Sequence, residues 1–274
     1  MLNEILSKIK ASKKYKNLSG EILVNEIQAY LKSNPNIKRI KKQDIKQIKA
    51  KLHRLYASYQ INKKNKRNKY LEELKQALKE NNHEKIIEIH KKILQTNISA
   101  RERLNEYESL YKEIFKITGI PLSIIDLGSG LNPLSFPFMN LNLLDYYAYE
   151  IDKSDVNFLN KYFEIMKEKG LNGKAEIFNI RNLEKISDLP LADIIFVFKL
   201  IDLLNTKNKK PGEELIKKLI EKTKFIVASF ATKTLFRKQM NFPRRKGFEL
   251  MLARNNLNFH KIEIKNEVFY VIYS

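Results

Sequence analysis

The sequence predicts an α/β protein in which an all-helical N-terminal region precedes a Rossmann-like domain with a seven-stranded sheet. As far as Gly119, apolar residues recur every three or four positions, which is the spacing of one helix face. From Leu122, short runs rich in Ile, Val, Phe and Tyr alternate with helical stretches. This alternation is typical of parallel strands joined by crossover helices. The change of period divides the chain near residue 119.

The first helical region is basic and interrupted. Apolar residues keep helical spacing over 22–31, stop at Asn34-Pro35 and resume over 45–56. Residues 62–69 then contain five basic side chains, which indicates a linker or a helix end. We therefore expect a first helical subdomain at residues 1–68.

A second helical region follows. Leucines within 71–78 and isoleucines within 86–94 predict two helices. Ser99 and Glu102 have the spacing of a capping box, so a further helix is expected to begin there and to continue to Phe115. Gly119 and Pro121 end it. The predicted second subdomain covers residues 69–118.

Residues 119–274 are expected to form the sheet domain. Its predicted strands are 123–127, 146–151, 174–178, 193–198, 224–230, 259–265 and 268–273. The first five alternate with helices, and the last two, separated by Asn266-Glu267, indicate a closing antiparallel hairpin.

The composition excludes several kinds of site. The chain has no cysteine, which removes disulfides, thiolate nucleophiles and cysteine-based zinc sites. Its four histidines, His53, His83, His90 and His260, have no ligand spacing, so no metal is expected. The start lacks the apolar run of a signal peptide, and the most apolar segment, 191–204, is interrupted by charges. A cytoplasmic protein is therefore expected.

The positive charge is concentrated at the N-terminus. The first 70 residues contain 19 lysines and arginines but only 4 acidic residues, so +15 of the net charge of +21 lies there. Such an imbalance favours a polyanion as partner, and nucleic acid first. An AT-rich codon bias or an anionic membrane surface would be alternative explanations. The residues expected to dock the nucleic acid are Lys8, Lys10, Lys13, Lys14, Lys16, Lys41, Lys42, Lys63, Lys64, Lys66 and Arg67.

A glycine turn follows the first predicted strand. Gly128 and Gly130 allow the backbone to approach a ligand closely, and no third glycine completes the dinucleotide fingerprint. Glu150 ends the second strand, where a carboxylate accepts hydrogen bonds from ribose hydroxyls, with Asp152 as second choice. After the third strand, Asn179 and Ile180 are placed to hold an adenine. Alternatively, the acids are solvated loop residues.

Four motifs occur in one order. They are Ser-Ala-Arg-Glu-Arg-Leu at 99–104, Asp-Leu-Gly-Ser-Gly-Leu-Asn-Pro-Leu at 126–134, Phe-Lys-Leu-Ile-Asp-Leu-Leu at 198–204 and Ser-Phe-Ala-Thr-Lys-Thr-Leu at 229–235. Together they resemble the aminoglycoside-resistance 16S rRNA (guanine-N7) methyltransferases, over roughly the last two thirds of the chain.

The resemblance implies a class I methyltransferase domain and the cofactor S-adenosyl-L-methionine. It also implies methylation of N7 of a decoding-site (A-site) guanine in the 30S subunit, the modification that gives aminoglycoside resistance. The helical region would dock on the subunit, and its second subdomain would contribute to the cofactor site. The cofactor-binding residues implied here or chosen above are Arg103, Arg101, Asp126, Gly128, Gly130, Glu150, Ile151, Asn179, Ile180 and Phe198.

Within that set, Arg103 would bind the carboxylate of the cofactor's methionine part, with Arg101 as the nearby alternative. Lys199, inside an apolar segment, is expected in a catalytic positioning role near cofactor or substrate; a lysine extending from a strand end into solvent is the alternative. The chain departs from the family at Ile201-Asp202, where Leu-Pro is common, and in a shorter loop after Thr234.

That loop is expected to face RNA. Lys233, Arg237 and Met240 are predicted RNA contacts, and Phe230, Phe236, Met240 or Phe242 would pack on a flipped base, although Phe230 also suits the core. Guanine N7 carries no proton, so no general base is expected. The alternatives are an inactive ribosome-associated RNA-binding protein, or a methyltransferase of another RNA nucleotide. A monomer is expected.

Overall fold

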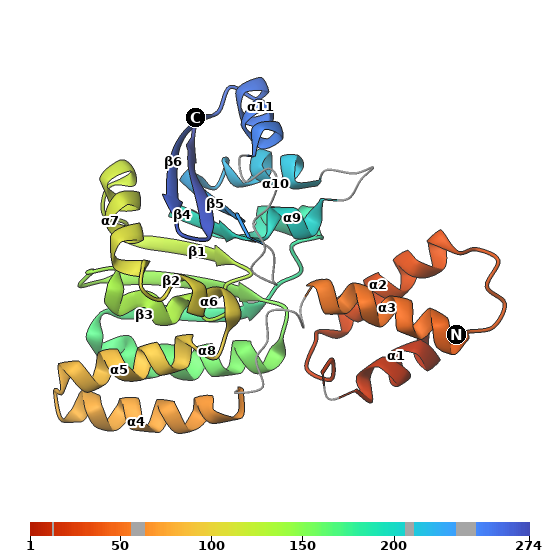
Figure 1. Cartoon of the computed structure of the whole chain (residues 1–274), viewed down its shortest axis with the longest axis horizontal. Helices are drawn as coiled ribbons and strands as arrows, with labels where there is room; N and C mark the ends of the chain where they lie inside the picture. Colours follow the sequence, from red (N-terminus) through yellow and green to blue (C-terminus); the bar gives the residue numbers. More distant parts are fainter. Residues whose placement is uncertain (13, 56–63, 206–210, 234–244) are drawn as a thin grey trace.

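The computed structural model describes residues 1–12, 14–55, 64–205, 211–233 and 245–274. In these residues a mixed seven-stranded sheet is flanked by helices, and three N-terminal helices gather beside it (Figure 1). The predicted fold class is confirmed.

The three N-terminal helices form a small bundle, which we call the N-terminal bundle. It consists of α1 (Leu2–Lys10), α2 (Gly20–Ser33) and α3 (Lys42–Leu55). Ser19 caps α2, because its side chain accepts a hydrogen bond from the amide of Ile22. The bundle has its own core of Ile5, Ile9, Tyr15, Leu18, Leu23, Ile27, Ile48 and Leu52.

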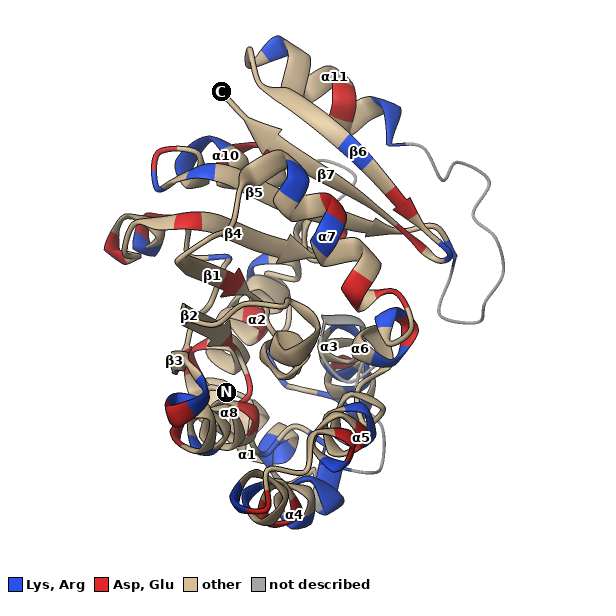
Figure 2. Cartoon of the chain, turned by 90° about the vertical axis from the view of Figure 1, so that its left-hand side faces the viewer, with Lys and Arg blue, Asp and Glu red and all other residues tan. Residues whose placement is uncertain are grey.

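Four further helices precede the sheet: α4 (Arg67–Lys79) after the 3-10 turn η2 (Lys64–Lys66), α5 (His83–Leu94), α6 (Ile98–Arg103) and α7 (Tyr107–Thr118). The expected capping box is wrong, because the cap of α6 is Asn97, whose Oδ1 accepts from the amide of Ala100 at 3.2 Å. The expected single helix is also two, α6 and α7, separated at 104–106. Unlike the strongly basic N-terminus, α4, α5 and α7 carry charges of both signs (Figure 2).

All seven predicted strands occur in the structure, each close to its predicted place in the sequence. They are β1 (Ser123–Leu127), β2 (Leu144–Glu150), β3 (Leu171–Ile177), β4 (Ala192–Phe198), β5 (Thr223–Ala231), β6 (Asn258–Ile264) and β7 (Glu267–Tyr273). They lie in the order β3-β2-β1-β4-β5-β7-β6, with β7 antiparallel to both neighbours. Glu267, expected in the hairpin turn, instead begins β7 and is buried.

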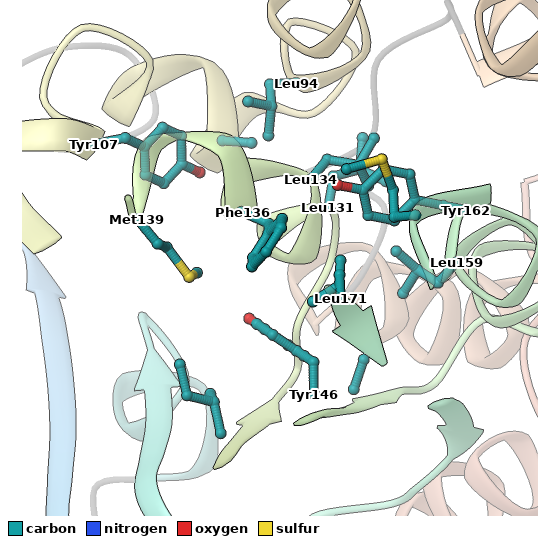
Figure 3. Packing of buried hydrophobic residues seen from close by; sticks show 14 of the residues in the cluster. Leu94, Tyr107, Leu131, Leu134, Phe136, Met139, Tyr146, Leu159, Tyr162 and Leu171 are labelled. Carbon is teal, nitrogen blue, oxygen red and sulfur yellow. The ribbon is translucent and has the colours of Figure 1, made fainter. Parts of the chain in front are cut away.

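Two apolar layers cover the sheet. On one face α4, α5, α7, α8 (Lys153–Met166) and the 3-10 segment η3 (Asn132–Phe138) share a core, part of which is seen in Figure 3 with Leu94, Phe136 and Tyr162. The other face is covered by α9 (Ile201–Leu204), α10 (Pro211–Leu219), α11 (Lys246–Arg254) and the 3-10 segment η5 (Leu183–Asp188). The short 3-10 turn η4 (Lys167–Lys169) precedes β3.

The N-terminal bundle attaches at the carboxyl end of β2. Leu18 forms an isolated antiparallel bridge with Asp152. The amide of Ser19 donates to the carbonyl of Ile151 at 3.1 Å, and the amide of Lys153 donates to that of Asn17 at 3.0 Å. Figure 1 shows the arrowheads of β1 and β2 pointing toward this bundle. The bundle therefore lies beside the edge where parallel strands of such sheets hold ligands.

The subdomain boundaries at 68 and 118 stay predictions. The separate core of the N-terminal bundle agrees with a division before α4. Helices α4, α5 and α7, however, pack their buried residues into the same core as the sheet.

Candidate functional site

A cavity opens at the carboxyl edge of the sheet, between β1, β2, β4 and helix α6. We call it the carboxyl-edge cavity. It is lined by Asn97, Ser99, Ala100, Arg103, Asp126, Gly128, Ser129, Gly130, Leu131, Asn132, Glu150, Ile151, Phe178, Ile180, Phe198, Lys199, Leu200 and Leu203. The side chains come from both halves of the chain, which makes it the candidate binding site.

The glycine turn after β1 forms the floor of this cavity. Gly128 and Gly130 have φ values of 67° and 54°, in the left-handed region that favours glycine. The amides of Gly128 and Ser129 both donate to the carbonyl of Tyr149, at 2.8 and 3.1 Å. A Cβ on Gly130 would lie 3.4 Å from Asn97 Nδ2. The turn is therefore held tightly against β2 and against the cap of α6.

Glu150 faces this turn. Its Oε2 accepts from the amide of Gly130 at 2.9 Å, and its Oε1 accepts from the amide of Ile151 at 2.7 Å. Burial, assisted by the charge of Asp155, raises the pKa of Glu150 to about 7. The carboxylate is thus fixed in direction while it remains at the cavity wall. That arrangement suits a ligand that presents hydroxyl donors.

Asp126 supports the turn from below. It is buried, and its Oδ2 accepts from Asn132 Nδ2 at 2.9 Å and from the Tyr146 hydroxyl at 2.6 Å. Burial raises the pKa of Asp126 to about 6. Because the bond to Asn132 joins the two ends of segment 126–132, Asp126 fixes the shape of the glycine turn.

A buried ionic network forms the opposite wall. Arg103 Nε and Nη2 each donate to Glu267 at 2.9 Å, and the Arg103 guanidinium lies 4.8 Å from the centre of the Phe198 ring. Lys199 Nζ binds Glu102 at 2.7 Å and Glu267 at 3.2 Å. Ser229 also donates to Glu267. Glu267 therefore joins three elements, and both cations that the sequence singled out meet on it.

Lys199 reaches this network from a strained backbone. Its φ is 55°, in the left-handed region, and its amide donates to both the carbonyl and the hydroxyl of Ser229, at 3.1 and 3.0 Å. The turn directs a largely buried lysine into the cavity rather than into solvent. The alternative of a solvated strand-end lysine is wrong.

The structure brings most of the predicted cofactor residues together. Eight of the ten line the cavity, as does Lys199; Arg101 and Asn179 do not. Arg101 is exposed. Asn179 is buried, and its Oδ1 accepts from the amide of Arg181 at 3.2 Å. What any of them binds stays a prediction.

Sequence reasoning missed Glu267, Asn97, Ser129 and Phe178. The signal that pointed toward Glu267 was Lys199, since a cation inside an apolar run requires a nearby acid, although the sequence did not indicate which one. Ser129 stood inside the glycine motif but carries no distinctive signal. Its hydroxyl is buried without a hydrogen-bond partner among the described residues.

The predicted RNA-docking residues divide into four groups, the last of which is the buried Arg67 described below. Exposed on or near the N-terminal bundle are Lys8, Lys10, Lys14, Lys16, Lys41, Lys42 and Lys66. Lys64 is partly buried and binds Asp152 and Asp155, at 3.1 and 2.8 Å, and Lys233 is partly buried as well. Lys13, Lys63, Arg237 and Met240 lie outside the described residues, as do Phe236 and Phe242.

The prediction that Arg67 contacts RNA is wrong. Its side chain is only 2% exposed and is bound by Asp155 and Thr96, so it does not face RNA. Phe230 is likewise buried, against Phe248 and Tyr270, and packs in the core rather than on a target base.

No group of three or more His, Cys, Asp or Glu residues in the described ranges is arranged to hold a metal ion. Among the helices that the structure describes, none combines the length and the apolar character needed to cross a bilayer.

Comparisons with known proteins agree with this geometry. The family model described as ribosomal RNA methyltransferase (FmrO) matches residues 12–272. A 16S rRNA (guanine(1405)-N(7))-methyltransferase of Proteus mirabilis is 27% identical over 286 aligned positions, covering 99% of this chain and 96% of that protein. A protein of the same name from Micromonospora rosea is 26% identical over 231, covering 84% and 82%. Among solved structures, the 16S rRNA methyltransferase RmtF with S-adenosyl-L-homocysteine has a TM-score of 0.77 at 18% identity, covering 99% of this chain and 97% of that one.

Proposed function

The chain belongs to the FmrO family of ribosomal RNA methyltransferases, and we propose that it methylates N7 of a decoding-site guanine of 16S rRNA in the 30S subunit. S-adenosyl-L-methionine would be the methyl donor, and the modification would give aminoglycoside resistance. We further propose a cytoplasmic monomer. The relatives of Proteus mirabilis and Micromonospora rosea carry this activity in their names.

The carboxyl-edge cavity is the observation that carries the proposal. The glycine turn and the oriented carboxylate of Glu150 suit a nucleoside, since the turn admits a close ligand and the carboxylate accepts ribose hydroxyls. Ile180 and Phe178 offer apolar surface for an adenine. Arg103, which lines the cavity and binds Glu267 through Nε and Nη2, would bind the methionine carboxylate.

The residues of the chain would act by position rather than by proton transfer. When bound, the cofactor supplies an electrophilic methyl group. Guanine N7 is unprotonated, so no side chain has to remove a proton from it. Lys199, fixed by Glu102 and Glu267, would hold the approaching nucleotide, and the apolar walls around Phe198 and Leu200 would exclude water.

The N-terminal bundle suits a ribosomal partner. Its exposed lysines lie on the part of the molecule that contacts the carboxyl end of β2, next to the cavity. Such a surface would neutralise rRNA phosphates and bring a flipped guanine to the cavity.

The test is methyl transfer from labelled S-adenosyl-L-methionine to 30S subunits, naked 16S rRNA and tRNA. We expect label in the 30S subunit, at one guanine, where borohydride and aniline cleave the chain as they do at N7-methylguanosine. Label confined to tRNA or protein, or a labelled adenine, would disprove the proposed target.

A further inference from the structure

Arg67 joins two walls of the carboxyl-edge cavity without lining it. Its Nη1 donates to Asp155 Oδ1 at 2.7 Å, its Nε to Thr96 Oγ1 at 2.7 Å and its Nη2 to the carbonyl of Thr96 at 3.2 Å. The guanidinium also lies 5.8 Å from the centre of the Phe158 ring. Three hydrogen bonds in a fixed fork set the distance between the two partners.

Thr96 leads directly into the wall formed by α6. The next residue, Asn97, caps α6 and places its side-chain amide against Gly130. The same helix then supplies Ser99, Ala100 and Arg103 to the cavity. A shift of Thr96 therefore moves the cap, the surface against the glycine turn and the start of the Arg103 network together.

Asp155 leads to the wall formed by β2. It lies in the first turn of α8, and Asp152 caps that turn by accepting from the amides of Ser154 and Asp155, at 2.8 and 3.0 Å. Glu150 and Ile151 immediately precede this cap and line the cavity. The position of Asp155 thus sets the position of Glu150.

We propose that Arg67 is a positioning residue for the cofactor, an inference that rests on the proposed function. Arg67 would hold the α6 cap and the segment that contains Glu150 at the separation that S-adenosyl-L-methionine requires. Helix α4 is already anchored by Leu71, Leu74 and Ala77, so its packing does not require a buried cation. Ion pairs buried in this way are often no more stable than apolar replacements, and a fixed geometry is what Arg67 adds.

The experiment measures binding of S-adenosyl-L-homocysteine by calorimetry to the full chain, together with KM values for cofactor and 30S subunits. Arg67→Lys keeps the charge but loses the fork. Thr96→Val removes the hydroxyl at nearly constant shape, and Thr96→Ser restores it. Tyr162→Phe is the control, because it removes the 3.1 Å contact with His90 at the neighbouring α5–α8 interface and leaves Arg67 unchanged.

We expect Arg67→Lys to raise the Kd for S-adenosyl-L-homocysteine about tenfold or more and Thr96→Val about fivefold, with matching rises in the cofactor KM. Thr96→Ser and Tyr162→Phe should stay within about twofold of wild type, even where the melting temperature falls. The KM for 30S subunits and the salt dependence of 30S binding should not change.

Two results would overturn the inference. Cofactor affinity unchanged in Arg67→Lys and Thr96→Val would leave Arg67 a structural residue. A shallower salt dependence of 30S binding with normal cofactor affinity would make it a docking residue. If the wild-type chain itself binds no S-adenosyl-L-homocysteine, the proposed function fails, and the inference with it.

Discussion

Arg103, which lines the cavity, and Glu267 stand 164 positions apart in the chain, yet they bind each other through two hydrogen bonds of 2.9 Å. Lys199 shares the same carboxylate. Strand β7, the last strand of the chain, therefore fixes two side chains that line the candidate site, although Glu267 itself does not line it.

Glu267→Gln keeps the shape of that side chain and removes its charge. Because the buried charges of Arg103 and Lys199 would then lack the carboxylate that they share, we expect the free energy of unfolding to fall by about 3 kcal/mol, measured by urea titration. Glu263→Gln, on the exposed strand β6, should change it by less than about 0.5 kcal/mol. Equal effects of the two substitutions would contradict the network.

The same variant has a pH signature. Burial works to raise the pKa of Glu267, but Arg103 and Lys199 hold it below its usual value. A carboxyl with a lowered pKa in the folded protein stabilises it above the unfolded value and loses this stabilisation as pH falls through the folded one. Wild type should therefore lose more stability than Glu267→Gln below about pH 4.5.

Glu150 should make cofactor affinity depend on pH. With a pKa of about 7, its carboxyl becomes charged, and a better acceptor for ribose hydroxyls, as pH rises from 6 to 8. Calorimetry should show affinity rising over this range in wild type. Glu150→Gln should bind more weakly with a flat profile, and a parallel rise in the variant would remove Glu150 from the explanation.

Ionisation of Glu150 should affect the stability of the cofactor-free protein in the opposite direction to cofactor affinity. A carboxyl whose pKa is raised by folding favours the folded state below its unfolded value of 4.5 and loses that contribution as pH passes about 7. As pH rises from 5 to 8, the melting temperature of the cofactor-free wild type should therefore fall relative to that of Glu150→Gln, which also lacks one of the two acceptor oxygens at every pH. A difference between the two proteins that does not change with pH would contradict the raised pKa.

His90 should confer acid sensitivity. It is fully buried between Ile86 and Tyr162, and burial lowers its pKa to about 4. Because the unfolded histidine titrates near 6.5, stability contributed by the neutral ring falls as pH drops from 6.5 toward 4. The melting temperature of wild type should drop further between pH 7 and 5 than that of His90→Gln. Parallel curves would exclude His90 as the cause.

The lysines of the N-terminal bundle should act on ribosome binding alone. Replacing Lys8, Lys10, Lys14 and Lys16 by Gln should weaken 30S binding and flatten its salt dependence by about 0.7–0.9 for each phosphate that is no longer neutralised. Cofactor affinity should stay unchanged. The matched control replaces four other lysines, Lys75, Lys85, Lys92 and Lys116, all paired with acids on α4, α5 and α7. An equal weakening there would mean that net charge, not the bundle, binds the subunit.

Periodicity was sufficient for the sheet, because apolar runs determine which segments are strands. Predicted and observed strand bounds differ by no more than three residues. Periodicity does not show whether a polar side chain is exposed to water or binds a partner that is distant in the sequence. Arg67 looked like one more cation in a basic run, but the first turn of α4 points it at Asp155, 88 positions later. Ser99 had the right spacing for a cap, yet Asn97 occupies that position.

The antiparallel bridge between Leu18 and Asp152 has a consequence for how such enzymes diversify. Residues 17–19 and 151–153 satisfy each other's backbone groups, so a chimaera that exchanges the first helices must bring a compatible partner segment or leave these groups unpaired. Residues 151–153, which such an exchange would affect, directly follow Glu150. Changes in the first helices are therefore coupled, through the backbone, to the position of a residue that lines the cavity.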